Sequence, residues 1–255
     1  MNVRERSNWT NKDIEYLKNV NITEYDLVSG GLSVIKEYHL LPDDKIKILD
    51  EMDKESKNIA VGKLQIKLKN LAKNMVIGFG NARQLFVDLN NIQDDNILSI
   101  KKDAMFLIHC YDVNGQVSDN LLFRPKNTYS SYMYINRKEF YFTSKTRQLD
   151  TKGFSEEVRN KQADYIFKDF SKFMLLSEKG DEKKLMDALA LYQTMYLNKE
   201  LPVETYRNLD TGMFEYGGQF EMDTIDEDYI EDVDVSYNYM TYVLPMIQIL
   251  LKRGD

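Results

Sequence analysis

The period of the apolar residues changes along the chain and separates predicted strands from predicted helices. Compact or alternating apolar runs predict strands over 20–27 and 129–143 and a hairpin over 96–109. Helical spacing predicts helices over 10–18, 32–41, 43–52, 54–91, 155–176, 181–198 and 235–252. This order predicts an α+β fold, in which a small antiparallel sheet has helices on one side and a mainly helical C-terminal part follows.

Two regions are predicted, with a boundary near 153–160, where strands give way to helices. Residues 1–153 would form an α+β domain, and 154–255 a helical region with an acidic loop at 208–234. No lysine or arginine lies between Arg207 and Lys252. The acidic run Glu221–Val235 in this gap is interpreted either as a solvated loop or as a mimic of DNA phosphate that occupies a basic cleft.

Composition narrows the classes of site that the chain can carry. The net charge of −7 argues against a general polyanion binder, although lysines and arginines gather at 54–84 and 124–172. A single cysteine, Cys110, and two histidines exclude an internal disulfide and a standard structural zinc site. Any metal would be held by carboxylates, which favours Mg²⁺, Mn²⁺ or Ca²⁺. No apolar run suits a signal segment or a membrane span, so a cytoplasmic protein is expected.

Three charged residues, Lys101, Lys102 and Asp103, lie in the middle of the predicted apolar hairpin. Asp26 ends an earlier predicted strand, just before Ser29 and two glycines. Two carboxylates at the ends of neighbouring strands can hold divalent ions that activate an attacking oxygen and stabilise a leaving group. The simpler interpretation keeps Asp103 as a turn residue and Asp26 as a helix cap or Asx-turn residue.

Five stretches occur in an order that resembles the palm and thumb of family B DNA polymerases. They are YDLVSGGLSVIKE, KNLAKNMVIGFG, ILSIKKDAMFLI, KNTYSSYMYINRKEFYF and DTKGF. The resemblance implies a palm/fingers-like domain over 1–153, a thumb-like region over 154–255, a Mg²⁺ or Mn²⁺ cofactor and a primer–template nucleic acid as partner. It also implies roles for particular residues: catalysis and metal binding for Asp26 and Asp103, nucleotide binding for Lys69, Lys73 and Asn74, and nucleic-acid binding for Lys126, Tyr129 and Lys152.

The sequence departs from the family pattern at two positions. Lys101 stands where the acidic hairpin would have its first aspartate, and Gly31 stands where a tyrosine is expected. If Lys101 and Asp103 shared one strand face, the ammonium would weaken metal binding by that carboxylate. The resemblance therefore implies a divergent phage or mobile-element protein that transfers nucleotides to a primer 3′-OH. Whether it is catalytically impaired or one subunit of a split enzyme stays open.

A second function class fits the same sequence. The negative net charge and the acidic run are compatible with a non-enzymatic phage or mobile-element protein that binds another protein, as an assembly factor or an inhibitor of host defence. The tyrosines of 129–141 are interpreted as strand and core residues, with stacking on bases as the alternative.

Overall fold

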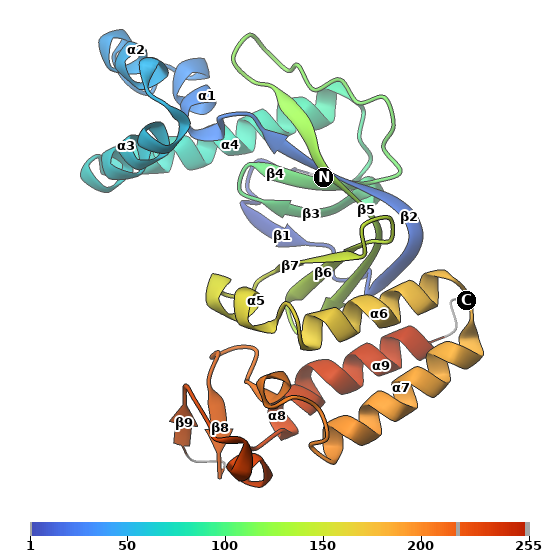
Figure 1. The fold of residues 1–255 in the computed structure, drawn as a ribbon. Helices are drawn as coiled ribbons and strands as arrows, with labels where there is room; N and C mark the ends of the chain where they lie inside the picture. Colours follow the sequence, from blue (N-terminus) through green and yellow to red (C-terminus); the bar gives the residue numbers. More distant parts are fainter. Residues whose placement is uncertain (1, 218–219, 253–255) are drawn as a thin grey trace. The chain divides into compact units, whose positions relative to one another are not determined.

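The computed structural model describes residues 2–217 and 220–252, and it confirms an α+β fold (Figure 1). Seven strands form an antiparallel sheet in the order β1-β3-β4-β2-β5-β6-β7, and a separate hairpin pairs β8 with β9. Helices dominate after β7, as the spacing predicts. The helices of the described chain include none that is long and apolar enough to cross a membrane.

The strands of the main sheet and the hairpin have the following bounds. They are β1 Asn8–Thr10, β2 Tyr16–Leu27, β3 Ile97–Lys101, β4 Ala104–Ile108, β5 Phe123–Ile135, β6 Lys138–Thr143, β7 Gln148–Lys152, β8 Phe214–Tyr216 and β9 Phe220–Met222. The α-helices are α1 Gly30–Glu37, α2 Asp43–Glu51, α3 Lys54–Lys67, α4 Lys69–Leu89, α5 Glu156–Gln162, α6 Ile166–Glu178, α7 Glu182–Leu197, α8 Ser236–Asn238 and α9 Leu244–Leu251.

The chain divides into two compact units. Unit 1 takes the described residues of Met1–Asn11 and Asn21–Thr128, and unit 2 takes those of Lys12–Val20 and Tyr129–Asp255. The units divide differently from the boundary expected near 153–160, because β5 and β6 pack their apolar side chains with the later helices. Met133 and Phe142, for example, share one buried core with Phe170 of α6 and Met246 of α9.

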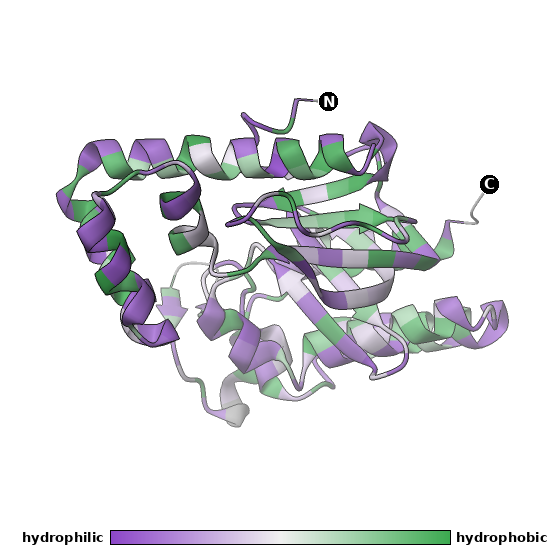
Figure 2. Cartoon of the chain, turned by 90° about the horizontal axis from the view of Figure 1, so that it is seen from above, coloured by the Kyte–Doolittle hydropathy of each residue, from purple (hydrophilic) through white to green (hydrophobic). Residues whose placement is uncertain are grey.

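Unit 1 has its core between strands β3 and β4 and helices α1 and α4. Alternate apolar residues of the strands, such as Ile100 and Met105, are fully buried with Phe86 of α4. The ring of Phe86 stacks on that of Phe123, with ring centroids 4.4 Å apart. Along α4 hydrophobic and hydrophilic residues alternate in bands, as expected for a helix that buries one face (Figure 2).

Two helix predictions need correction. The predicted helix over 10–18 is wrong: β1 ends at Thr10, the Asn11 N–H donates to the Leu98 carbonyl at 2.9 Å, and β2 already begins at Tyr16. Ladder bonds to a buried strand therefore outweigh the weak local helical pattern. The predicted tract over 54–91 is helical but ends and restarts at Leu68, which has φ −115° and ψ 87°.

Unit 2 packs α6, α7 and α9 on one face of β5 and β6. The expected final helix over 235–252 is interrupted by a π-helical turn at Tyr239–Val243, and α9 begins next to Pro245. Proline fits there because the first turn of a helix needs no intrahelical partner for its N–H groups. The expected acidic loop at 208–234 contains the β8–β9 hairpin and a 3₁₀ turn at Glu227–Asp232.

Candidate functional site

The structure brings Asp26 and Asp103 to neighbouring strand ends within unit 1. Asp26 lies near the end of β2 and is in register with Ala104 of β4. Asp103 is the second residue of the tight turn between β3 and β4, and its carbonyl accepts the N–H of Leu27 at 3.1 Å. The predicted hairpin is confirmed, and Asp26 near the end of β2 lies beside the turn that carries Asp103, far from it in the sequence.

Lys101 does not face Asp103 as the sequence analysis expected. Lys101 is the last residue of β3, whereas Asp103 lies in the turn beyond it, so the two-residue period of a strand does not relate them. The Lys101 Nζ instead donates to Asn8 Oδ1 and Thr10 Oγ1 of β1, both at 3.1 Å. The ammonium of Lys101 is therefore engaged with β1 rather than with the acidic pair.

Glu24 and Lys126 complete the charges around Asp26. Glu24 lies two residues before Asp26 on β2 and is buried, and its Oε2 accepts from Asn127 Nδ2 at 2.7 Å. The Lys126 Nζ lies 3.4 Å from Glu24 Oε1 and 3.7 Å from Asp26 Oδ2. One ammonium of β5 thus bridges two carboxylates of β2.

The pKa shifts of Asp26 and Lys126 reflect the negative charges that lie close to both side chains. Burial raises the pKa of Asp26, and the charge of Asp103 raises it further, against the opposing effect of Lys126. Burial alone would lower the pKa of Lys126, but Glu24 and Asp26 outweigh burial and raise it. A cation added between Asp26 and Asp103 would relieve the repulsion between their carboxylates.

A cavity of about 530 Å³ opens beside Asp103. Four cationic side chains contribute to its wall: Lys54 and Lys57 from α3, Arg83 from α4 and Lys102 from the β3–β4 turn. Most of the remaining wall comes from α1, α3 and α4 and is largely apolar. An apolar cavity with several cations and one carboxylate suits a ligand that combines a flat organic group with phosphate.

The residues predicted to bind the nucleotide lie elsewhere on α4. Lys69, Lys73 and Asn74 are exposed, and none of them lines the cavity. Of the lysines that do line it, Lys54 and Lys57 lie at the start of α3, where Asp53 caps the helix by accepting the N–H groups of Glu55 and Ser56, and Lys102 lies in the β3–β4 turn. Contact of Lys69, Lys73 and Asn74 with a nucleotide stays a prediction.

The predicted nucleic-acid contacts differ in how the structure presents them. Lys126 is half-exposed and paired with acids, as described above. Tyr129 is buried in unit 2, where its hydroxyl donates to Asp150 Oδ2 at 2.8 Å and its ring packs 5.1 Å from that of Tyr141. Tyr129 therefore packs within the sheet, as the first interpretation of these tyrosines has it. Lys152 is partly exposed on β7, in register with Glu139.

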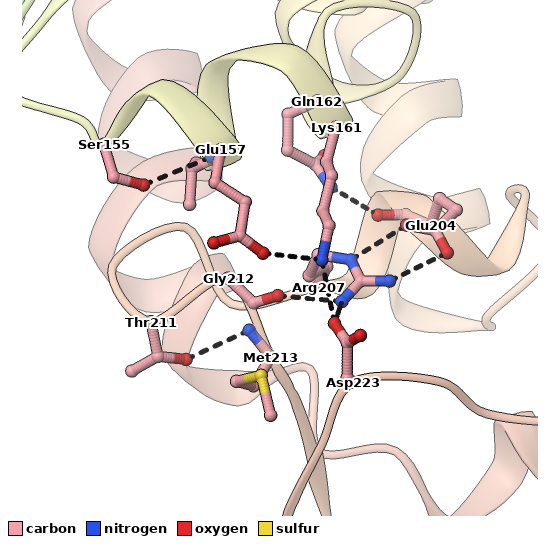
Figure 3. Close-up of polar contacts among 11 residues, drawn as sticks. Ser155, Glu157, Lys161, Gln162, Glu204, Arg207, Thr211, Gly212, Met213 and Asp223 are labelled. Carbon is pink, nitrogen blue, oxygen red and sulfur yellow. Dashed lines mark hydrogen bonds and ion pairs between the residues drawn. The ribbon is translucent and has the colours of Figure 1, made fainter.

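A second polar cluster, in unit 2, surrounds the guanidinium of Arg207 (Figure 3). The Nε and Nη2 atoms donate to the two carboxylate oxygens of Glu204 at 2.9 and 3.0 Å. The Nη1 donates to the Gly212 carbonyl at 2.8 Å and to Asp223 Oδ1 at 3.2 Å, and Lys161 also pairs with Asp223. All three guanidinium nitrogens are engaged within the chain, so we assign this cluster to structure and not to ligand binding.

The donor set of the acidic pair fits Mg²⁺ or Mn²⁺ that arrives with phosphate. No group of three or more His, Cys, Asp or Glu suited to a metal occurs within residues 2–217 and 220–252. Mg²⁺ is commonly held by one or two carboxylates together with waters and substrate phosphate oxygens, rather than by an all-protein cage. Asp26 and Asp103 form such a pair, and four cationic side chains line the cavity beside Asp103.

Several residues of the site were missed by the sequence analysis. Glu24 carried a signal, because i and i+2 positions of a strand share a face and Asp26 was already a candidate. Arg83 carried no such signal, because it donates hydrogen bonds to the carbonyl groups of Lys102 and Arg6, which lie far from it in the sequence. Lys54 and Lys57 follow the helix-capping residue Asp53, but only the packing of α3 beside α4 turns them toward the hairpin.

Comparison with known proteins gives one family and a solved structure. The family model described as "Bacteriophage PBS1 gene 130 protein" matches residues 1–252. No curated protein matches the chain. Among solved structures, the chain is similar to the family B DNA polymerase from the hyperthermophilic archaeon Pyrobaculum calidifontis, with a TM-score of 0.46 and 11% identity. That match covers 95% of this chain but only 46% of the polymerase chain, so this chain spans about half of its length.

Proposed function

The chain belongs to the family of the bacteriophage PBS1 gene 130 protein, and we propose that it is a divergent, polymerase-like phage protein that binds nucleic acid. The observation that carries the proposal is the pairing of β2 with β4, which sets Asp26 beside the turn that holds Asp103. The proposed reaction is nucleotidyl transfer to a primer 3′-OH, dependent on Mg²⁺ or Mn²⁺.

Each group of the site has a proposed task. Asp26 and Asp103 hold the divalent cation, which when bound polarises the phosphoryl oxygens of the nucleotide. Lys54, Lys57 and Lys102 bind the phosphates from the wall of the cavity. Lys126 offsets part of the negative charge of Glu24 and Asp26, and so lowers the electrostatic repulsion among the carboxylates of Glu24, Asp26 and Asp103.

Primer extension tests this proposal. Wild type should extend a labelled primer–template with Mn²⁺ or Mg²⁺, and Asp26→Asn or Asp103→Asn should lower the rate about 100-fold or more, because a catalytic metal contributes several kcal/mol. Asp119→Asn is the matched control, since Asp119 is exposed in the loop after β4. Equal rates of extension by wild type and the three variants would show that neither Asp26 nor Asp103 takes part in the reaction. No extension together with no affinity for primer–template would refute the proposal as a whole.

A non-enzymatic role in binding another protein is the second candidate. It is favoured by apolar side chains that α4 leaves exposed, namely Ile77, Leu85 and Leu89, at 51%, 41% and 47% of their full accessible surface. These residues recur at helical spacing, as a helix-binding partner would require. Capture of one defined phage or host protein, lost in the Ile77→Ser/Leu85→Ser variant but kept in Asp26→Asn, would support this role over the first.

A further inference from the structure

Arg83 of α4 connects two segments that are distant in the sequence. Its side chain is almost fully buried, with 1% of the residue exposed. The Nη1 donates to the carbonyl of Lys102 in the β3–β4 turn, and the Nη2 donates to the carbonyl of Arg6 at 2.8 Å. Burial lowers the pKa of Arg83 to about 10 while the charge of Asp103 opposes that shift, so the guanidinium stays charged at neutral pH.

The segment Val3–Ser7, called the strap here, also contacts the β3–β4 turn. Val3 is fully buried, and its N–H donates to Gln84 Oε1 at 3.0 Å. The Ser7 carbonyl accepts the N–H of Lys102 at 2.7 Å. The strap passes so close to α4 that a Cβ on Gly80 would lie 2.1 Å from the Arg4 carbonyl oxygen, a distance that only glycine permits.

The turn that carries Asp103 needs such support. Lys102 has φ 52°, in the left-handed region that non-glycine residues adopt at a cost. Its N–H is bound by the strap and its carbonyl by Arg83, so both polar groups of this residue are fixed from outside the hairpin. Asp103 follows directly, and its carboxylate packs 2.9 Å from where a Cβ on Gly30 would stand.

Resting on the proposed function, we infer that Arg83 is the positioning residue of the acidic pair. It holds the Lys102–Asp103 turn and the strap together, and so keeps the Asp103 carboxylate beside Asp26. A planar guanidinium suits this task because its N–H groups diverge at fixed angles toward two carbonyl groups. Lysine has one flexible ammonium and cannot fix both carbonyls in the same geometry. The Nε–H of Arg83 is buried and has no hydrogen-bond partner in the described chain, so the two Nη atoms carry the contacts that hold the turn and the strap.

Hydrogen exchange and Mn²⁺ affinity together test this inference. In Arg83→Lys and Arg83→Met, amide exchange over 97–108 and 3–8 should rise, and Mn²⁺ affinity should fall about 10-fold or more, as for residues that orient metal ligands. Gly80→Ala should displace the strap alone, with faster exchange over 3–8 and a smaller loss of affinity. Arg159→Met, at an exposed position of α5 in unit 2, is the control and should change neither quantity.

The outcomes separate this inference from the proposed function. If Arg83→Met does not fold, Arg83→Lys and Gly80→Ala decide the result. Unchanged exchange over 97–108 in a folded Arg83 variant would overturn the positioning role, whatever the protein does with metal. Faster exchange with unchanged Mn²⁺ affinity would reduce Arg83 to a structural residue and overturn the inference. A wild type that binds no Mn²⁺ would refute the proposed function, and with it the task that we assign to Arg83.

Discussion

At the scale of single residues, Asp26 is defined by the charges around it. Its side chain keeps about a third of its exposure, yet burial and the nearby Asp103 raise its pKa above the ordinary value. The ionised carboxylate is therefore less favourable in the folded protein than in the unfolded chain. Acids arranged in this way are a common feature of sites that bind cations, because the cation restores the balance of charge.

Asp26→Asn is expected to stabilise the metal-free protein at neutral pH. Because the pKa of Asp26 is higher in the folded protein than in the unfolded chain, ionising this carboxyl group destabilises the folded state. The destabilisation is absent at pH values below the unfolded pKa, and it develops as the pH rises from there through the folded pKa. The gain should be less than about 1 kcal/mol, because solvent screens this partly exposed group. Urea unfolding at pH 4 and pH 7.5 measures it. An Asp26→Asn variant that is less stable than wild type at pH 7.5, but equal to it at pH 4, would contradict the account.

The sequence analysis predicted that Asp26 and Asp103 lie at neighbouring strand ends, and the pairing of β2 with β4 confirms that placement. It did not predict their surroundings. The contacts of Arg83, Lys101 and Lys126 each join positions far apart in the chain, and no local pattern encodes such contacts. The binding of metal by Asp26 and Asp103, and the roles of the other site residues in binding nucleotide or nucleic acid, stay predictions.

At the scale of elements, two glycines show which helix positions are fixed by packing. A Cβ on Gly78 would lie 2.4 Å from Val34 Cγ1 and 3.0 Å from a ring carbon of Tyr38, both on the neighbouring α1 segment. A Cβ on Gly62 of α3 would meet nothing within 4 Å. The same substitution should therefore have opposite effects on the two helices.

Gly78→Ala should destabilise the protein by about 1–3 kcal/mol, because α1 and α4 must separate to admit the methyl group. Gly62→Ala should stabilise it by up to about 1 kcal/mol through better helix propensity. The midpoints of urea unfolding measure both changes, with Gly62→Ala as the matched control. Equal stability of the two variants would show that α1 and α4 are not packed as described.

The Arg207 cluster fixes part of the acidic segment in unit 2. Arg207→Met should lower stability by about 2–3 kcal/mol, since it removes hydrogen bonds to charged groups around a buried guanidinium. Lys161→Met removes the more exposed partner of Asp223 and should lower stability much less than Arg207→Met does. Thermal unfolding measures both. A larger loss for Lys161→Met than for Arg207→Met would contradict the structural role of the guanidinium.

Element types were predicted best where packing agrees with the local pattern. The β3–β4 hairpin, the strands over 129–143 and α7 follow their sequence periods. The predicted helix over 155–176 is divided into α5 and α6, and the one over 235–252 contains the π-helical turn. The helix prediction over 10–18 is wrong because β1 ends at Thr10 and β2 begins at Tyr16, and the break at Leu68 lies inside an otherwise continuous helical pattern. Non-local pairing decides such positions, and a single sequence does not display it.

At the scale of the whole molecule, the net charge of −7 opposes the phosphate binding that we propose. The positive charge is local, since Lys54, Lys57 and Lys102 line one cavity of unit 1. The sequence predicted two regions, yet the compact units divide at the residues where β2 and β5 run, because both strands contribute residues to each unit. Because the boundary falls inside two strands, no change of amino-acid composition along the sequence marks it.

The affinity for a nucleoside triphosphate should depend on these three lysines. Replacing Lys54, Lys57 and Lys102 by glutamine should weaken binding about 10-fold or more, because hydrogen bonds to charged groups contribute about 1.5–3 kcal/mol each. Replacing Lys69 and Lys73, the lysines that the sequence predicts to bind the nucleotide, should change the affinity little. Fluorescence anisotropy with a labelled nucleoside triphosphate measures both. The reverse pattern would favour the α4 lysines over those of the cavity.

Binding of Mn²⁺, followed by its electron paramagnetic resonance signal, is the decisive experiment on the acidic pair. Wild type should bind Mn²⁺ at pH 7.5, and a nucleoside triphosphate should tighten that binding. Asp26→Asn and Asp103→Asn should each weaken it about 10-fold or more, whereas Asp119→Asn should not. Wild-type affinity in both Asp26→Asn and Asp103→Asn would show that these neighbouring carboxylates do not hold a cation, and would contradict the account.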